Sequence, residues 1–327
     1  RLMDALSKPF GTLHGVPVVG YYLENARGTR VCVLNLGGIV QDYSLRTDNG
    51  RLPLVIGYDN AADYVQNPFQ INKQIGRVAG RIAGAAFDLF GKPCRVEANE
   101  GRNALHGGSH GLAGTLFTVQ RLDAQLLRLS TTVTATQDGY PGDLELSIDY
   151  QLDADDRLIL RYEATAHGDT VFDPTLHIYW RLPRGLHGCT LHIPQGEHIA
   201  VDAEKLPLNA DDNPAYDFRH ARPLDDAVRA SGGFDDIYRV PADIRQAAAI
   251  LSTPDYRVRL YGDRNGLIIF TAAPQDGTAH DAGTYDALAT ELQTLPNSLH
   301  RPEYGDIRLK DGARHQSTII FQPERGH

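Results

Sequence analysis

Strict alternation of apolar and polar residues is the feature of this 327-residue sequence that most constrains its fold. The alternation runs through residues 127–135, 144–152 and 157–163, and in the second stretch every even position from Leu144 to Leu152 is apolar. Because successive side chains of a β-strand point to opposite faces, a period of two is typical of a strand with one buried and one solvated face. Turn-forming segments rich in Asp and Gly separate the stretches, so we expect antiparallel strands.

The same texture covers much of the remaining chain, from Gly20 to Asp59 and from Tyr256 to Gln322. No linker, charge block or fixed-period repeat divides the sequence. The sequence therefore predicts an all-β protein, a large antiparallel β-sandwich that forms a single domain over residues 1–327. A few short helices are expected within it, at Asn60–Val65, Asp225–Ala230 and Ala242–Ile250.

The charge balance and the cysteine content exclude some classes of protein. Asp and Glu total 41 against 32 Lys and Arg, and a net charge of −9 argues against nucleic acid or a membrane surface as the partner. No apolar run approaches the roughly 20 residues that span a bilayer, and residues 1–20 lack a signal-peptide pattern. Cys32, Cys94 and Cys189 are far apart and odd in number, which favours free thiols and a cytoplasmic protein.

The loop of residues 103–111 is the first candidate for a functional site. It places His106 directly before Gly107 and Gly108, where the backbone can bend sharply and a ligand can come close. A histidine in a Gly-rich turn is also common on ordinary surfaces, so this loop is not decisive alone.

Further candidates lie on extended segments. Arg77 and Arg81 are an even number of residues apart, so in a strand they would point to the same side. Asp235 follows two glycines, and Glu291 shares one face of a β-like segment with Gln293, whose carboxamide could fix the orientation of the carboxylate. Solvated turns and strand faces show the same patterns, so these residues need independent support.

Residues 175–182 form a strand-like segment that contains the only tryptophan. His177, Tyr179 and Arg181 share one face of it, and Trp180 lies on the opposite, apolar face. The segment therefore carries an imidazole, a phenol and a guanidinium in one row, which is either a functional surface or the wet side of a sheet.

In their order along the chain these motifs resemble the aldose 1-epimerase (galactose mutarotase) family. The resemblance covers nearly the whole sequence and depends on many separated motifs rather than on any one of them. The motifs are Phe10-Gly11, Leu34-Asn35-Leu36-Gly37-Gly38-Ile39, Gly57-Tyr58-Asp59, Ile75-Gly76-Arg77-Val78-Ala79-Gly80-Arg81-Ile82, Asn103-Ala104-Leu105-His106-Gly107-Gly108, Tyr140-Pro141-Gly142, His177-Ile178-Tyr179-Trp180, Gly233-Phe234-Asp235 and Glu291-Leu292-Gln293-Thr294-Leu295-Pro296.

The resemblance implies both the fold and the roles of particular residues. His106 and His177 correspond to the two active-site histidines, and Glu291 to the catalytic base. Arg81 and Asp235 correspond to positions that hold sugar hydroxyls. The family fold is a large antiparallel β-sandwich, in agreement with the alternation described above.

Two positions depart from the family pattern. Gly80 and Arg181 each stand where family members usually have Asn. Neither position supplies a proton-transfer group, so the departures bear on substrate identity rather than on activity. Arg181 would lie about 13 Å along the strand from His177 and could reach the rim of a sugar site.

The implied reaction explains why a carboxylate and two imidazoles are needed. Interconverting the α and β anomers of a sugar requires loss of a proton from the C1 hydroxyl and gain of a proton by the ring oxygen. An acid and a base that act together avoid the charged sugar that either step alone would create. We therefore expect Glu291 to be the base, His177 the acid and His106 a hydrogen-bonding partner, with no cofactor and no metal.

Alternative readings remain open at this stage. A hexose-phosphate epimerase would use Arg181 or Arg77 to grip the phosphate, and a sugar-binding module would keep the pocket without turnover. A glycoside hydrolase would want two facing carboxylates. Zinc is a weaker alternative, because the spacing of the potential ligands His187, Cys189, His192 and His198 matches no standard zinc signature.

The partner expected from the sequence is a small aldose rather than nucleic acid or a membrane. Nothing in the residue pattern distinguishes a monomer from a homodimer, and both remain open. The preferred aldose is also left open, because the orientation of each sugar hydroxyl is recognised by the precise positions of side chains.

Overall fold

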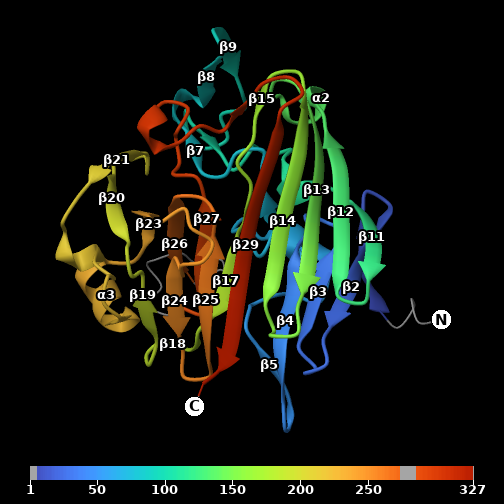
Figure 1. Cartoon of the computed structure of the whole chain (residues 1–327), viewed down its shortest axis with the longest axis vertical. Coiled ribbons are helices and arrows are strands. Elements are labelled where there is room, and N and C mark those ends of the chain that lie inside the picture. The colour runs from blue at the N-terminus through green and yellow to red at the C-terminus, as the bar shows by residue number, and fades with distance from the viewer. Residues whose placement is uncertain (1–5, 273–284, 327) are drawn as a thin grey trace.

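The computed structural model describes residues 6–272 and 285–326, and within them antiparallel β-sheets dominate. Figure 1 shows the long central strands running vertically, the N-terminal strands in blue at the lower right, and the strands of residues 190–272 on the left. The largest sheet has nine strands, in the order β11 (Thr118–Asp123), β12 (Leu126–Val133), β13 (Asp143–Leu152), β14 (Leu158–His167), β29 (Arg314–Arg325), β25 (Tyr256–Gly262), β24 (Ala249–Ser252), β19 (Thr190–His192) and β22 (Arg222–Pro223).

Two further sheets complete the main body of the described fold. The six-stranded sheet has the order β17 (Ile178–Arg181), β27 (Ala287–Gln293), β26 (Gly266–Ala272), β23 (Asp235–Arg239), β20 (Glu197–Val201) and β21 (Pro207–Ala210). The five-stranded sheet comprises β1 (Ser7–Leu13), β2 (Val16–Glu24), β3 (Arg30–Leu34), β4 (Val40–Thr47) and β5 (Gly50–Pro53) in sequence order.

Short strand pairs and helices connect these sheets. The pairs are β6 (Gln74–Ile75) with β16 (Thr175–Leu176), β7 (Arg81–Ile82) with β10 (Ala104–Leu105), β8 (Ala86–Leu89) with β9 (Lys92–Arg95), and β15 (Thr170–Val171) with β28 (Arg308–Leu309). One more strand, β18, spans Pro183–Leu186, and the helices are α1 (Ala61–Gln66), α2 (Ala135–Asp138) and α3 (Leu224–Ser231).

The predicted antiparallel β-sandwich is confirmed. The three alternating stretches are β12, β13 and β14, and their polarity pattern matches their burial, since even positions of β13 are buried. Residues 273–284, within the predicted β region that begins at Tyr256, lie outside the described residues. The single-domain organisation over the whole chain stays a prediction.

Two of the three predicted helices are correct and one is wrong. Helix α1 begins after Asn60, whose side chain accepts the backbone N–H of Asp63 as an N-cap, and α3 ends at Gly232 in a left-handed conformation. The stretch 242–250 is not helical, and its last residues enter β24. There Ala249 pairs with Leu260 of β25 and is fully buried, so burial in the sheet overrides the helix propensity of its alanines.

Trp180 joins the central core to the six-stranded sheet. Its ring is fully buried and packs against Tyr43 and Phe321, with ring centroids 6.3 and 5.1 Å away. The indole N–H donates to Thr290 Oγ1 at 2.9 Å, so the one polar atom of the ring is satisfied. Because Thr290 directly precedes Glu291, this bond also fixes the position of β27 where the chain carries a candidate site residue.

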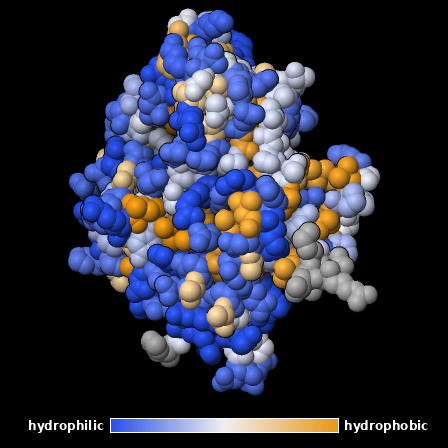
Figure 2. Space-filling model, turned by 45° about the vertical axis from the view of Figure 1, so that its right-hand side comes forward, coloured by the Kyte–Doolittle hydropathy of each residue, from blue (hydrophilic) through white to orange (hydrophobic). Residues whose placement is uncertain are grey.

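The surface of the protein contains both hydrophilic and apolar residues. Figure 2 shows one face that is mostly hydrophilic at its upper and lower ends, with apolar residues scattered across its middle. Among the described residues, no helix is both long enough and apolar enough to cross a membrane.

Arg77 belongs to the core, contrary to the expectation that it shares a side with Arg81. Its guanidinium donates from Nε and Nη2 to the two carboxylate oxygens of Asp138 at 2.8 and 3.0 Å, and both side chains are completely buried. The segment between the two arginines is not extended, because Gly80 has φ +75° and redirects the chain. Arg77 is therefore a structural residue and is not available to grip a phosphate.

The Arg77–Asp138 pair yields a stability prediction. We expect Asp138→Ala to lower the free energy of unfolding by about 3–5 kcal/mol, because it leaves a buried guanidinium without its partner. Asp149→Ala, which removes the partner of the partly exposed Arg128, should cost about 1 kcal/mol or less. Urea unfolding followed by circular dichroism measures both, and equal losses would contradict the assignment.

Candidate active site

A pocket of about 240 Å³ opens over one face of the six-stranded sheet. Strands β17, β23, β26 and β27 supply its floor, and the loops around β6, β7 and β10 supply its sides. Its wall combines aromatic and aliphatic side chains with a few ionisable ones, the composition typical of small-molecule sites. The described lining residues are Pro68, Phe69, Gln70, Gly80, Arg81, Glu100, Leu105, His106, His177, Tyr179, Lys205, Asp235, Ile237, Ile268, Phe270, Glu291, Gln293 and Pro296.

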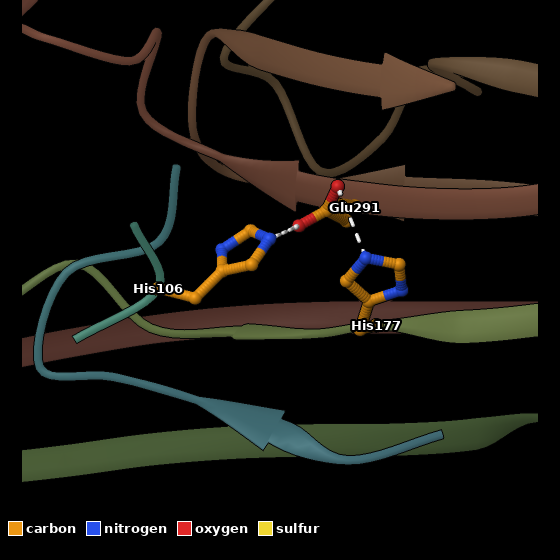
Figure 3. A group of neighbouring side chains, drawn as sticks. All are labelled: His106, His177 and Glu291. Atoms are coloured by element: carbon orange, nitrogen blue, oxygen red, sulfur yellow. Dashed lines mark ion pairs between the residues drawn. The ribbon is translucent and has the colours of Figure 1, made fainter. Parts of the chain in front are cut away.

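Glu291 lies between His106 and His177 (Figure 3), and all three residues line this pocket. Its Oε1 is 3.7 Å from His106 Nε2 and its Oε2 is 3.6 Å from His177 Nε2. Glu291 is only 4% exposed and His177 only 6%. Three residues that are distant in the sequence therefore form one desolvated cluster, as the resemblance implied.

Strand register explains how the chain brings these side chains together. Strand β17 pairs with β27 so that Ile178 is opposite Thr290, and the same register continued by one residue places His177 beside Glu291. Strand β10 pairs with β7 so that Leu105 is opposite Arg81. The loop after β10 then carries His106 toward the same point.

Hydrogen bonds to Gly80 fix the orientation and the tautomer of His106. The His106 backbone N–H donates to Gly80 O at 3.0 Å, and the Gly80 backbone N–H donates to His106 Nδ1 at 3.0 Å. Because Nδ1 accepts a hydrogen bond, the neutral ring carries its proton on Nε2. His106 therefore points an N–H donor at Glu291 and at the pocket.

Gly107 allows the close approach that this loop needs. Gly107 has φ +81°, and a Cβ there would lie 2.1 Å from Gly76 O. A side chain at Gly107 would therefore push the loop, and His106 with it, away from the pocket. This is the physical reason for the His-Gly pair in the sequence.

The cluster resembles a metal site in composition but does not fit one in detail. His106, His177 and Glu291 offer ligand atoms that all lie within 4.8 Å of one another. A metal-bound histidine normally donates its second N–H to an acceptor, whereas His106 Nδ1 faces the donor N–H of Gly80. Metal binding at His106 Nε2 would put a proton on Nδ1 against another N–H, so these residues do not suit a metal.

Burial shifts the proton affinities of the cluster. Desolvation, reinforced by the nearby charge of Asp235, raises the pKa of Glu291 to about 8. Desolvation lowers the pKa of His177 to about 4 and holds the pKa of His106 well below its usual range, where the neighbouring His177 adds to the effect. At pH values between about 4 and about 8, the pair of Glu291 and His177 therefore holds one titratable proton.

Several buried polar atoms in the pocket lack a partner among the described residues. They are His177 Nδ1, Glu291 Oε1 and Gln293 Oε1. Gln293 is held by bonds from its amide nitrogen to Ala79 O and Thr294 O, at 3.3 and 3.2 Å. Buried polar groups in native proteins are usually hydrogen-bonded, so these atoms are suited to a polar ligand that enters the pocket.

Arg81 and Asp235, the two residues predicted to hold sugar hydroxyls, both line the pocket. Arg81 Nη2 is 3.8 Å from Asp235 Oδ2, and Glu100 holds the same guanidinium through both its carboxylate oxygens. The bidentate pair fixes the plane of the arginine. Sequence reasoning did not find Glu100, because it lies in a turn whose contact with Arg81 depends on the fold.

Asp235 is itself positioned by a second layer of charges. Its backbone N–H donates to Asp236 Oδ2 at 3.1 Å, and Asp236 Oδ1 lies 2.9 Å from His198 Nε2. His198 Nδ1 is 2.7 Å from Asp211, and its ring stacks on Tyr216. His198 thus contacts two carboxylates, one of which is on β23 beside Asp235.

The other potential zinc ligands do not join His198. His192 Nε2 lies 3.0 Å from Arg219 O, His187 is exposed with Nδ1 3.7 Å from Asp225, and Cys189 Sγ lies 3.5 Å from Gly185 O. Within the described residues these side chains form no metal-binding group.

Arg181 does not reach the pocket, so the expectation that it reaches the rim is wrong. His177 and Tyr179, from the same predicted row, do line the pocket, and their rings stack with centroids 5.1 Å apart. Strand β17 carries Arg181 away, to where its N–H donates to Leu54 O and its carbonyl accepts from the Tyr256 hydroxyl. Gly80, the other departure from the family pattern, does line the pocket.

The fold and this site define an antiparallel β-sandwich enzyme equipped for acid–base chemistry on a small polar molecule. Comparison with known proteins agrees. The family model described as aldose 1-epimerase matches residues 20–322. The chain belongs to the aldose 1-epimerase family, whose members are isomerases that act on carbohydrates.

Individual relatives show how far the similarity extends. The chain is 35% identical to the maltose epimerase of Levilactobacillus brevis, over 99% of this chain and 100% of that protein. It is 32% identical to an aldose 1-epimerase of Streptococcus thermophilus, over 92% of each. A GalM/aldose epimerase homologue from C. elegans has the same fold, with a TM-score of 0.86 at 20% identity, over 95% of this chain and 100% of that one.

The raised proton affinity of Glu291 gives a prediction about stability. Its pKa rises from 4.5 in the unfolded chain to about 8 when folded, so its favourable contribution is complete below pH 4.5 and is lost as the pH rises through 8. In Glu291→Gln the side chain does not titrate, so the variant does not lose this stability as the pH rises. Between pH 5 and pH 9 the variant should therefore gain roughly 2–4 kcal/mol of unfolding free energy relative to the parent.

Denaturant unfolding at each pH measures this difference. The shift of His177 is common to parent and variant and cancels to first order. Glu145→Gln, which breaks an exposed ion pair with His167, should show a much smaller change between pH 5 and pH 9 than Glu291→Gln. A parent–variant difference that does not change with pH would mean that Glu291 is ionised normally in the fold.

Proposed function

We propose that this protein is an aldose 1-epimerase that interconverts the α and β anomers of a free hexose such as galactose or glucose. The observation that carries the proposal is the position of Glu291, with its two oxygens 3.7 and 3.6 Å from the imidazoles of His106 and His177. A carboxylate and an imidazolium in one desolvated pocket can remove one proton and deliver another in a single event.

Each residue has a defined step in this proposal. Glu291 accepts the proton of the C1 hydroxyl while His177 donates a proton to the ring oxygen, and the bond between C1 and the ring oxygen breaks. Rotation about C1–C2 exposes the other face of the aldehyde. Closure then reverses both proton transfers, and the Nε2–H of His106 stabilises negative charge near the reacting oxygen.

The protonation states of Glu291 and His177 support these roles. The reactive pair of carboxylate and imidazolium contains the same single proton as a neutral carboxylic acid and a neutral imidazole. Binding a sugar therefore requires only a redistribution of that proton, with no uptake from water. Arg81 and Asp235 are proposed to hold hydroxyl groups of the same sugar.

The first prediction concerns the two proton-transfer residues. Glu291→Gln and His177→Asn should each lower kcat/KM by roughly 10²–10⁴-fold while the fold is kept, because each removes one proton-transfer group. Polarimetry of freshly dissolved α-D-galactose measures the rate, and circular dichroism checks the fold. Glu145→Gln should keep the parent rate, and undiminished mutarotation by Glu291→Gln would remove Glu291 from the role.

The second prediction concerns pH. The active form holds one proton on the Glu291–His177 pair, so kcat/KM should fall below about pH 4, where His177 binds a second proton, and above about pH 8, where Glu291 loses the last one. Initial rates between pH 3.5 and pH 10 measure both limbs. An alkaline limb that is unchanged in a residually active Glu291→Gln variant would contradict this assignment.

The two alternative functions are a hexose-phosphate epimerase and a non-catalytic sugar-binding module. For a hexose phosphate, Arg77 is buried against Asp138 and Arg181 lies away from the pocket, so both proposed phosphate grips are absent. A non-catalytic sugar-binding module would not need a shared proton at the bottom of its pocket. Both alternatives predict no acceleration of mutarotation with a free hexose.

Maltose is a second candidate substrate. The supporting observation is the 35% identity to a protein named maltose epimerase along the entire chain. Gly80 lines the pocket, and a Cβ there would crowd its neighbours, since it would lie 3.0 Å from Pro296 Cβ and 3.2 Å from Gln293 Nε2. A side chain at this position would therefore narrow the pocket, which should hinder a sugar of two rings more than a sugar of one.

Gly80→Asn tests this point. The added side chain should lower the ratio of kcat/KM for maltose to that for galactose by roughly tenfold. Gly84→Asn is a matched control, because Gly84 also has a positive φ but a Cβ there meets no atom within 4 Å. An unchanged ratio in Gly80→Asn would show that this position does not select the sugar.

The remaining expectations are also proposals. We place the protein in the cytoplasm, because its three cysteines are all free and two of them, Cys32 and Cys189, are buried. We propose an aldose as its partner, with neither nucleic acid nor a membrane involved, and a monomer or a homodimer as the active species.

A further inference from the structure

We propose that a groove next to the sugar pocket binds a small organic anion, a phosphate or a carboxylate, with Lys73 as its counter-charge. The groove has a volume of about 740 Å³ and shares Pro68 and Gln70 with the wall of the sugar pocket. The proposal is independent of the epimerase reaction.

Lys73 is the observation from which the proposal starts. It lines the groove, it is only 6% exposed, and its ammonium has no hydrogen-bond or ion-pair partner among the described residues. Desolvation lowers its pKa to about 8, so the amine is mostly charged at neutral pH. An unpaired charge on a largely desolvated side chain is unfavourable, and an anion in the groove would supply a partner for it.

The walls of the groove also suit an anion. None of the described residues that line it is Asp or Glu, although the whole chain has a net charge of −9. Besides Lys73, the lining includes His14, His110 and Thr131. Glu97, the carboxylate nearest to His110, accepts hydrogen bonds from Ser109 and is not part of the lining.

The backbone holds Lys73 in place for this role. On one side Asn72 is fully buried and donates to Val40 O and Ile56 O. On the other side Gln74 is fully buried between the hydroxyls of Tyr150 and Tyr162. A lysine between two such anchors is preorganised, so little ordering is needed when an anion binds.

Lys73 also contacts a proposed catalytic residue, His177. The backbone carbonyl of Lys73 accepts the N–H of His177 at 3.0 Å, and the positive charge of Lys73 acts on the His177 ring. An anion beside Lys73 would therefore change the electrostatic environment of the epimerase site without entering it.

Isothermal titration calorimetry with inorganic phosphate and with malonate, at pH 7 and constant ionic strength, tests the proposal. At least one anion should bind the parent, and the tighter one identifies a phosphate or a carboxylate site. Lys73→Met and Lys73→Gln should each weaken binding by roughly 10- to 100-fold. Lys92→Met removes the same charge from an exposed strand position and should have no effect.

A second titration, with saturating galactose present, separates the groove from the sugar pocket. The anion should still bind, because it occupies a different space. Three results would each overturn the proposal: no binding of either anion, equal binding by parent and Lys73→Met, or displacement of the anion by galactose. None of these readouts depends on catalytic activity, so they are distinct from a failure of the epimerase proposal.

Discussion

Burial of three ionisable side chains against one another is the constraint on which the rest of this structure depends. Glu291, His106 and His177 are held where water cannot solvate their charges, and this raises the pKa of the carboxyl and lowers the pKa of both imidazoles. This desolvation is unfavourable, so the surroundings must be rigid, since a flexible pocket would let the groups separate and become hydrated. The large antiparallel core supplies that rigidity.

Each member of the cluster is supported by a contact made elsewhere in the fold. Thr290, the neighbour of Glu291, accepts the indole N–H of the buried Trp180. The N–H of Gly80 orients the ring of His106, and the carbonyl of Lys73 holds the backbone of His177. The geometry of the cluster is therefore a property of the packed sheets and of one glycine loop, so stability and proton affinity depend on the same residues.

The sequence predicted what depends on local periodicity and on motif order. Alternation was enough for β12, β13 and β14, and parity placed Tyr179 on the pocket side and Trp180 in the core. Prediction from the sequence failed where the backbone conformation, or a contact between residues distant in the chain, determines the position of a side chain. The turn at Gly80 separates Arg77 from Arg81, a partner 61 residues away buries Arg77, and neither Glu100 nor Lys73 has a sequence pattern that signals its position.

The central claim is that Glu291 keeps its proton at neutral pH in the empty pocket. Difference infrared spectra of ¹³C-glutamate-labelled parent and Glu291→Gln protein between pH 4 and pH 10 measure this directly. The account predicts a carbonyl band of one protonated carboxyl that is absent from the variant and disappears with a midpoint near pH 8. A midpoint near the ordinary glutamate value of about 4.5 would contradict the account.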